Sequence, residues 1–254
     1  MNGMSYDLRG KVVVVTGGSR GIGLELARSF LAQGARVVIC GRKQENLAAA
    51  VATLGGGEGL LALPAHVARE ADVETLFETA LGRFGGLDIL VNNVGMNLMT
   101  ASVADADLAV WNKIIEGNLT GAFLCSRKAA RIMREKKRGK IVSISSLAGA
   151  KASPGMGIYG IAKAGLEMLT QVLAAELAPF NIQVNAIAPG VVRTDFSKPF
   201  WSTPAICEQI VKAIPAGRIA ETADLIPIVL LLASGFSDYI TGQTIMVDGG
   251  ASAI

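Results

Sequence analysis

The sequence has 254 residues, of which 51% are hydrophobic and 18% are charged, and its formal net charge at pH 7 is +3. This composition supplies a large core and excludes an extended disordered chain, and the small charge imbalance gives little support for a nucleic-acid partner. The three cysteines, Cys40, Cys125 and Cys207, form no CxxC pair, which suits a reducing compartment and argues against a disulfide framework or a metal site.

The charged and apolar runs indicate neither a nucleic-acid nor a membrane partner. The dense basic run from Arg131 to Lys140 is not interleaved with aromatic residues and lies where a helix is predicted to end, so we interpret it as a solvated helix terminus. The longest apolar stretch, residues 226–233, is too short to cross a bilayer, and residues 1–11 lack the apolar segment of a signal peptide. We therefore expect a cytoplasmic protein.

Strand-like and helix-like segments alternate along the whole chain. Buried strands are predicted at residues 11–18, 36–40, 60–67, 87–93, 139–146, 182–189 and 244–250. Helices are predicted at residues 21–35, 44–54, 69–85, 107–137, 157–179 and 222–233, with a loop-and-helix stretch at 191–214. Continuous hydrophobic strands between helices are typical of a parallel sheet covered on both faces. Since no linker or repeat divides the chain, residues 1–254 are predicted to form one doubly wound α/β domain.

A glycine-rich segment, TGGSRGIG at residues 16–23, lies between the first predicted strand and the first helix. In a doubly wound fold this turn presents backbone N–H groups and a helix N-terminus to a pyrophosphate. The three glycines Gly17, Gly21 and Gly23 allow the turn, the close approach of a ligand and the packing of helix on strand. A simple tight turn is the alternative interpretation of the glycines alone.

Tyr159 and Lys163 are four residues apart in IYGIAKAG, a spacing that places both side chains on one face of a helix. Such a pair can simply extend its polar ends into water. Alternatively, an ammonium about 4 Å from the phenol, at an effective dielectric constant near 20, would favour the phenolate by roughly 4 kcal/mol. Burial opposes this effect, but the gain is large enough to bring the phenol pKa from about 10 towards a useful range.

Seven motifs occur in the order found in one known family. They are TGGSRGIG, NNVG at 92–95, GNLTG with Asn118, ISS at 144–146, YGIAK, PGVVRT at 189–194 and ITGQTIMVDGG. Together they make the chain similar to the classical short-chain dehydrogenases/reductases over nearly its whole length. The resemblance implies a seven-stranded Rossmann sheet, a nicotinamide cofactor, a small-molecule substrate and assembly into homodimers or homotetramers.

The resemblance also implies roles for individual residues. Tyr159 matches the general acid of carbonyl reduction and the general base of alcohol oxidation, and Lys163 matches the lysine that lowers its pKa and binds the nicotinamide ribose. Ser146, thirteen residues before the tyrosine, matches the serine that steadies the substrate oxygen. Asn118 matches the helix asparagine that holds a water near the lysine. Besides Tyr159 and Lys163, the implied cofactor contacts are Gly17, Ser19, Arg20, Gly21, Ile22, Gly23, Arg42, His66, Val67, Asn93, Gly95, Pro189, Gly190, Val192 and Thr194.

Three residues depart from the family pattern. Val94 replaces an alanine, and His66 stands where many members have an aspartate beside the adenine. Contact of His66 with the adenine and an ordinary loop position both remain open. Gly160, directly after the tyrosine, is expected to loosen the start of its helix, where alanine would be the better helix former.

The residues after the second predicted strand indicate which dinucleotide binds. Enzymes that prefer NAD place an acidic residue there for the ribose 2′-OH, but this sequence has Gly41 followed by Arg42, with Arg20 inside the glycine loop. A guanidinium pairs with a 2′-phosphate, so we expect NADP(H) to be preferred over NAD(H). The alternative is that both arginines are ordinary exposed loop residues.

We predict an oxidoreductase that interconverts a ketone and a secondary alcohol. Reduction of a 3-oxoacyl thioester and reduction of a smaller ketone, or oxidation of a polyol or cyclic alcohol, remain open within this chemistry. Residues 191–218 form the predicted substrate loop, whose aromatic residues Phe196, Phe200 and Trp201 suit either an apolar wall or the core. A regulatory protein that binds a dinucleotide without catalysis is the alternative of a different class.

Overall fold

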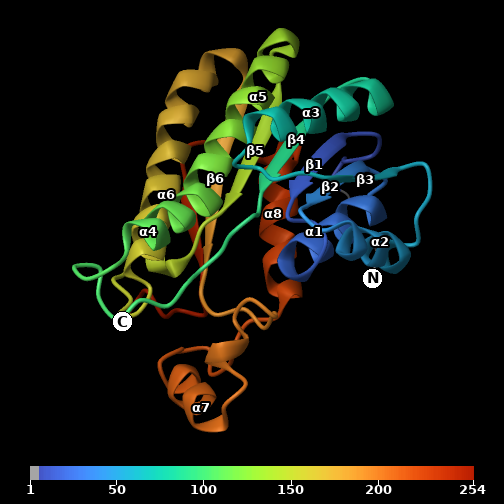
Figure 1. Ribbon diagram of the computed structural model, residues 1–254. Helices are drawn as coiled ribbons and strands as arrows, with labels where there is room; N and C mark the ends of the chain where they lie inside the picture. Colours follow the sequence, from blue (N-terminus) through green and yellow to red (C-terminus); the bar gives the residue numbers. More distant parts are fainter. Residues whose placement is uncertain (1–5) are drawn as a thin grey trace.

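The computed structural model describes residues 6–254, and seven parallel strands form its central sheet (Figure 1). The strand order is β3-β2-β1-β4-β5-β6-β7. The strands are Val12–Thr16 (β1), Arg36–Gly41 (β2), Leu60–Pro64 (β3), Ile89–Asn92 (β4), Gly139–Ile144 (β5), Ile182–Pro189 (β6) and Thr244–Val247 (β7). This arrangement is the doubly wound Rossmann-type α/β fold that the sequence predicts.

Helices cover both faces of the sheet. They are Gly21–Ala32 (α1), Gln44–Leu54 (α2), Glu70–Phe84 (α3), Leu108–Ile115 (α4), Gly121–Lys136 (α5), Gly157–Leu177 (α6), Pro204–Lys212 (α7) and Ile226–Ala233 (α8). A π-helical turn at Glu116–Thr120 joins α4 to α5, and a short 3-10 helix at Leu147–Gly149 lies between β5 and α6. In Figure 1, α7 projects away from the body of the molecule.

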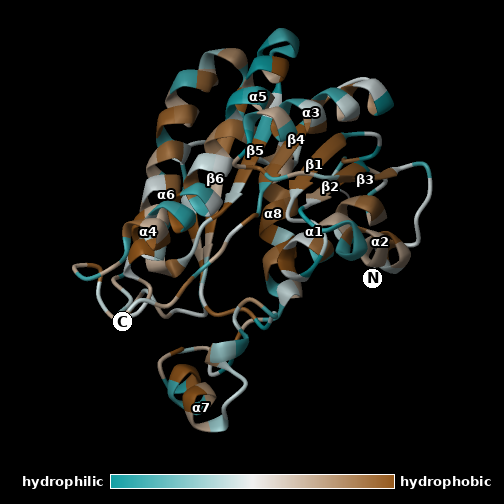
Figure 2. Cartoon of the chain, viewed as in Figure 1, coloured by the Kyte–Doolittle hydropathy of each residue, from teal (hydrophilic) through white to brown (hydrophobic). Residues whose placement is uncertain are grey.

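Alternation along each strand divides the hydrophobic core into two layers. Val14 and Leu90 point to the face that is covered by α3, α5 and the C-terminal half of α6. Val13 and Ile89 point to the opposite face, which α1, α2 and α8 cover. Because both faces are buried, the strands are hydrophobic throughout, as Figure 2 shows for the central strands and for α8.

The carboxyl ends of the parallel strands bring distant segments to one edge of the sheet. Between β1 and β4 the strand order changes direction, so the loops that follow these two strands lie next to each other across a crevice. The loops after β5 and β6 reach the same edge. In this way the segments carrying the predicted site residues meet although they are far apart in the sequence.

Several predicted element bounds differ from the structure. The strand predicted at 11–18 ends at Thr16 because Gly17 adopts a positive φ of 66°. The strand predicted at 60–67 ends at Pro64, and the Ala65 N–H makes the last bond to β2, to the Gly41 carbonyl oxygen at 3.0 Å. The single helix predicted at 107–137 is a helical run whose middle is the π-helical turn Glu116–Thr120.

The predictions about a signal peptide and a membrane-spanning segment can be compared with the structure only in part. Residues 1–5 of the segment considered for a signal peptide lie outside the described residues. Within residues 6–254, no helix has the combination of length and apolar character that crossing a membrane requires.

Candidate active site

The glycine loop turns sharply between β1 and α1. Gly17 and Gly21 have positive φ angles of 66° and 54°, a conformation that glycine adopts without strain. Arg20 is the N-cap residue of α1, but its side chain does not cap the helix, and the first turn contains no acidic residue. The first N–H groups of α1 are therefore left for an anion, as a pyrophosphate site requires.

Two residues from distant parts of the chain pack against this loop. The Asn93 amide nitrogen Nδ2 donates to the carbonyl oxygens of Thr16 at 3.0 Å and Gly17 at 3.2 Å, which ties the end of β4 to the end of β1. A β-carbon at Gly23 would lie 2.4 Å from the same nitrogen. The Thr194 methyl carbon Cγ2 would lie 3.4 Å from a β-carbon at Gly21, so the segment after β6 also reaches the loop.

The remaining predicted cofactor residues lie around the same edge. Ile22 packs, partly buried, on the core layer of α1. Val67 is buried beside Gly121 at the start of α5, where a β-carbon would lie 2.6 Å from its Cγ2. Pro189 ends β6, and the Gly190 N–H donates to the carbonyl oxygen of Val247 at 3.1 Å.

The end of β2 carries no acidic side chain beside the glycine loop. A β-carbon at Gly41 would lie 3.3 Å from the Ser19 hydroxyl oxygen, which shows how closely this strand end approaches the loop. Arg42 and Arg20 are both exposed. Within residues 6–254, no side-chain hydrogen bond or ion pair occupies either guanidinium.

Three observations show that the site fits a dinucleotide. First, the N-terminus of α1 has no side-chain cap. Second, His66 lies just after β3, and its buried Nδ1 atom lacks a hydrogen-bond partner among the described residues. This nitrogen is therefore free to bond to a nucleobase such as adenine. Third, a β-carbon at Gly95 would lie 3.3 Å from Asn118 Oδ1 and 3.6 Å from Lys163 Nζ, so this glycine leaves space in front of both groups.

Tyr159 and Lys163 lie on one face of α6, as their spacing predicts. Both are buried, and the Lys163 ammonium nitrogen lies 5.6 Å from the centre of the Tyr159 ring. The ammonium donates a hydrogen bond to the carbonyl oxygen of Ile144, the last residue of β5, at 2.8 Å. Ser146 lies two residues after Ile144, and its hydroxyl accepts from the Ala148 N–H at 3.2 Å. The structure therefore brings the predicted serine, tyrosine and lysine together at the end of β5.

The pKa of Tyr159 differs from the lowering that we expected from Lys163. Burial raises the pKa of Tyr159 to about 12, and interaction with the Ser146 hydroxyl acts in the opposite direction. Burial also lowers the pKa of Lys163 to about 8, which Glu167 partly counteracts. Desolvation is the largest cause of both shifts, so the depth of burial sets the direction of each pKa change. The phenol consequently holds its proton at neutral pH.

Asn118 lies in the π-helical turn and is almost completely buried. Its Nδ2 atom donates to the carbonyl oxygens of Met96 and Ile114, both at 2.8 Å, and its Oδ1 atom accepts from the Met96 N–H at 3.2 Å. The amide thus holds the loop after β4 against the helix. Short π-helical segments are frequent at functional sites, and the sequence pattern had not indicated this one.

Gly160 is a packing residue rather than a weak point of α6. A β-carbon at this position would lie 2.7 Å from the carbonyl oxygen of Ala148 in the short helix after β5. Alanine is the better helix former, but at this position the contact with the Ala148 backbone outweighs helix propensity. Close packing of α6 on the Leu147–Gly149 helix fixes Tyr159 relative to Ser146.

We expect Gly160→Ala to destabilise the protein by about 1–3 kcal/mol, the usual cost of overpacking. Gly82→Ala is the matched control, because Gly82 is an exposed residue of α3 with open space around its missing β-carbon. This second change should stabilise by about 0.5–1 kcal/mol. Urea denaturation of both variants measures the effects, and equal stabilisation by the two changes would contradict the packing role of Gly160.

The segment after β6 rises from the site and carries α7. Ser197 links the two sides of this segment through hydrogen bonds. The buried Ser197 hydroxyl donates to the carbonyl oxygen of Val192 and accepts from Trp201 Nε1 at 3.0 Å. The Arg193 side chain contacts Glu221 at 3.0 Å and lies over the Trp201 ring. The base of this segment is therefore well anchored, although α7 itself projects outwards (Figure 1).

Phe196 is the aromatic residue of this segment that faces the catalytic candidates. Its ring centre lies 6.1 Å from that of Tyr159, and 49% of the residue is exposed. Phe200 and Trp201 are partly buried. For Phe196, the structure therefore favours an apolar wall next to the site over a place in the core.

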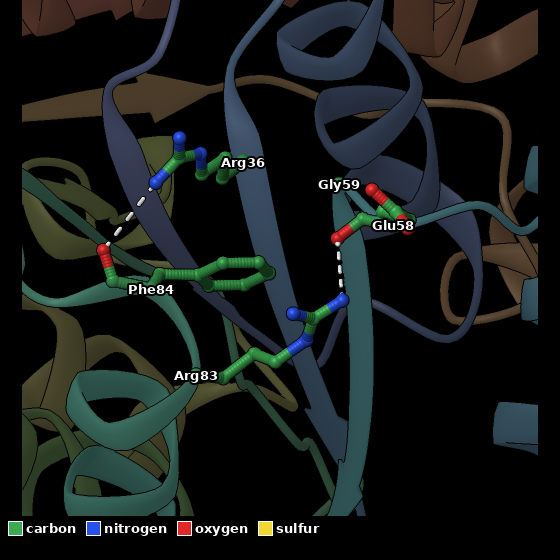
Figure 3. A pocket seen from close by; sticks show the side chains of 5 residues that line it. All are labelled: Arg36, Glu58, Gly59, Arg83 and Phe84. Carbon is green, nitrogen blue, oxygen red and sulfur yellow. Dashed lines mark hydrogen bonds between the residues drawn. The ribbon is translucent and has the colours of Figure 1, made fainter.

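A hollow of about 260 Å³ at the other end of the sheet is a different feature (Figure 3). Arg36 and Arg83 line it, but they donate to the carbonyl oxygens of Phe84 at 3.5 Å and Glu58 at 3.3 Å, respectively. The hollow lies near the amino ends of the strands, whereas ligands of open α/β sheets bind at the carboxyl ends. We therefore do not assign the active site to it.

Two polar residues next to the site were not singled out by the sequence pattern. The Ser145 hydroxyl donates to the Glu167 carboxylate oxygen Oε1 at 2.7 Å. Glu167 lies one helical turn after Lys163, and burial raises its pKa. A spacing of eight residues from Tyr159 was the signal in the sequence that could have revealed Glu167.

Comparison with known proteins gives matches over nearly the whole chain. Residues 17–252 match a family model described as enoyl-(acyl carrier protein) reductase. Dehydrogenase/reductase SDR family member 4 of Rattus norvegicus is 39% identical over 244 residues, a match that covers 96% of this chain and 88% of the relative. Its Homo sapiens counterpart is 38% identical with the same coverage.

Solved structures agree with the sequence matches. A structure from Agrobacterium tumefaciens, provisionally described as a gluconate dehydrogenase, is 34% identical, has a TM-score of 0.93 and is matched over 99% of this chain and all of its own. A short-chain type dehydrogenase/reductase from Mycobacterium marinum is 33% identical, with a TM-score of 0.91 and 98% coverage of both chains. The chain therefore belongs to the classical short-chain dehydrogenases/reductases, a family of oxidoreductases that use a nicotinamide dinucleotide.

Proposed function

We propose that this protein is an NADP(H)-dependent oxidoreductase that interconverts a ketone and a secondary alcohol. The observation that carries the proposal is the grouping of Tyr159, Lys163 and Ser146 at the end of β5, close to a glycine loop that fits a dinucleotide. In this proposal residues 1–254 form one domain, and residues 191–218 cover the substrate.

The reaction needs a hydride and a proton, and the nicotinamide supplies or accepts the hydride when it is bound. Tyr159 gives its phenolic proton to the carbonyl oxygen during reduction and takes it back during oxidation. Its raised pKa keeps it protonated at neutral pH, so the proton that reduction requires is present on the phenol. Ser146 donates a hydrogen bond to the same substrate oxygen, and Lys163 stabilises the phenolate left after proton transfer.

Two further groups complete the proposed site. Lys163 also binds the ribose hydroxyls of the cofactor, and Asn118 holds a water between this lysine and solvent. The position of Gly95, close to both Asn118 Oδ1 and Lys163 Nζ, supports these two roles. His66 contacts the adenine in this proposal, which is supported by its buried Nδ1 atom without a partner among the described residues.

The preference for NADP(H) rests on the charges beside the glycine loop. Arg42 and Arg20 are exposed, and Gly41 provides no acid that would repel a 2′-phosphate. A guanidinium is well suited to phosphate oxygens because it donates in a planar fork.

The aromatic wall formed by Phe196 favours a ketone with an apolar substituent over a polyol. This residue is half-exposed and stands beside the Tyr159 ring, where a substituent of the carbonyl carbon would lie. A 3-oxoacyl thioester remains the second candidate. It is favoured by the basic side chain of Lys198 on the same segment, which would attract an anionic carrier, whereas Lys212 and Arg218 are paired with Glu208 at 2.8 Å and Asp224 at 2.7 Å.

The test is the loss of NADPH absorbance with a panel of carbonyl compounds. The panel contains an aryl ketone, an aliphatic keto-ester, an acetoacetyl thioester and a keto-sugar. Turnover of the aryl ketone or keto-ester supports the proposal, and selective turnover of the thioester favours the second candidate. Binding of NADPH without turnover of any compound would favour the non-catalytic alternative.

We also expect a homotetramer or homodimer. Phe123 on α5 and Met168 and Val172 on α6 are 42%, 56% and 45% exposed, which is unusual for large apolar side chains on neighbouring helices. Sedimentation velocity at micromolar concentration should therefore give a species larger than the monomer. The double variant M168E/V172E should dissociate it, whereas Thr53→Glu on α2 should not. A monomeric wild type would contradict the prediction.

A further inference from the structure

Glu167 extends the row of functional side chains along α6. Tyr159, Lys163 and Glu167 follow one another at intervals of four residues, so they lie on the same face of the helix. The carboxylate is on the side of Lys163 that faces away from Tyr159. It is the third titratable group in this row, and the proposed reaction does not use it directly.

The carboxylate is held in a defined position. The Ser145 hydroxyl, which is buried, donates to Glu167 Oε1 at 2.7 Å and lies 3.4 Å from the carbonyl oxygen of Lys163. A β-carbon at Gly149 would lie 2.5 Å from the same carboxylate oxygen, so the carboxylate packs closely against this glycine. Alternation along the strand end directs Ser145 to this carboxylate and leaves the adjacent Ser146 to the substrate side.

Lys163 is a buried cation, and within residues 6–254 Glu167 is the one carboxylate that acts on it. Its direct hydrogen bond goes to the Ile144 carbonyl, which carries no charge. Asn118, whose Oδ1 atom borders the same space at Gly95 as Lys163 Nζ, is also neutral. Tyr159 is the other titratable neighbour and is protonated at neutral pH.

The charges of the two groups support each other. Burial lowers the pKa of Lys163 to about 8, and Glu167 acts against this lowering through space. Burial raises the pKa of Glu167, whereas the Ser145 hydrogen bond and the Lys163 charge lower it. Ser145 thus favours the ionised carboxylate, and the ionised carboxylate favours the ammonium.

We propose that Glu167 is a positioning residue, oriented by Ser145, whose negative charge keeps Lys163 protonated in its buried place beside Tyr159. The inference rests on the proposed function, because it explains how the ammonium needed by Tyr159 and by the cofactor ribose is maintained. It assigns a role to the Ser145–Glu167 pair, which does not itself contact substrate or cofactor.

The test is the pH profile of kcat/KM for reduction with NADPH in wild type and Glu167→Gln. Tyr159 has a pKa far above neutral, so an alkaline limb near pH 8 reports loss of the Lys163 proton. Removing the carboxylate charge should move this limb downwards by roughly one pH unit or more, the size of effect a nearby opposite charge produces. Activity at pH 6.5 should stay within about threefold of wild type.

Matched variants separate charge from shape. Glu176→Gln removes the same charge from an exposed position near the other end of α6, and its profile should coincide with that of wild type. Glu167→Asp and Glu167→Asn have nearly the same size and differ in charge. The aspartate variant should keep an alkaline limb above that of the asparagine variant, and this pair serves if Glu167→Gln does not fold.

An alkaline limb that is unchanged in Glu167→Gln, or moved equally by Glu176→Gln, would overturn the inference. Uniform loss at every pH with an unmoved limb would also overturn it, because that result indicates a merely structural role. Failure of the proposed function has a different signature, namely that wild type reduces no carbonyl compound or that Tyr159→Phe keeps its turnover.

Discussion

Tyr159→Phe is expected to lower turnover by about 10²–10⁴-fold, the usual contribution of general acid–base catalysis. The change removes one oxygen atom from a buried side chain and keeps the ring, its packing and its contact with Phe196. Folding and NADPH binding should therefore remain close to wild type. The measurements are kcat on a confirmed carbonyl substrate and the NADPH dissociation constant from fluorescence.

Tyr239→Phe is the matched control for this experiment. Tyr239 is fully exposed near the start of β7, and it loses the same atom without access to the site. Its turnover should equal that of wild type. If Tyr159→Phe were within a few-fold of wild type on a confirmed substrate, the assignment of Tyr159 as the general acid would be wrong.

Arg42→Ala is expected to weaken the interaction with NADPH by roughly 1.5–3 kcal/mol, the range for a hydrogen bond to a charged group. The reason is that Arg42 follows Gly41 at the end of β2, where the 2′-phosphate of the cofactor would lie. Little change is expected with NADH, which lacks this phosphate. The measurement is kcat/KM for both cofactors in wild type and variant.

Lys43→Ala tests whether any positive charge at this strand end has the same effect. Lys43 is also exposed, but it lies 3.9 Å from Glu45 and is therefore partly neutralised. Its ratio of NADPH to NADH efficiency should stay near that of wild type. Preference of the wild type for NADH, or equal losses with both cofactors in Arg42→Ala, would refute the assignment.

Most of the fold could be predicted because the same local signals, hydrophobic runs ended by glycines, recur along the alternating strands and helices. The bounds of α2 and β6 coincide with the predicted ranges 44–54 and 182–189, where hydrophobic runs meet clear ends at Gly55 and Gly190. Prediction was less accurate where a tertiary contact accompanies a change in the backbone hydrogen-bond pattern. The π-helical turn around Asn118 is such a place, because the Asn118 side chain bonds to Met96 in the loop after β4, which the helical pattern of residues 107–137 does not reveal.

The candidate site was predictable as a set of residues, but its energetics were not. The spacing of Tyr159 and Lys163 correctly placed both on one helix face. Spacing says nothing about the depth of burial, and burial reverses the expected direction of the Tyr159 pKa. Likewise, the need for glycine at position 160 depends on the Ala148 carbonyl, which belongs to another element.

Tyr159 lies where elements of the core, β5 and α6, meet an outward segment that carries Phe196 and α7. This division has consequences for how the protein could evolve. The groups proposed for proton transfer are carried by β5 and α6, which are built into the sheet and its covering layer. Phe196 and α7, in contrast, belong to an outward segment that is anchored at its base through Ser197. Under the proposed function, substitutions or insertions in that segment would change which molecules are accepted while the reaction itself is inherited unchanged. New substrate ranges would be reached most readily by exchanging residues 195–213 between homologues.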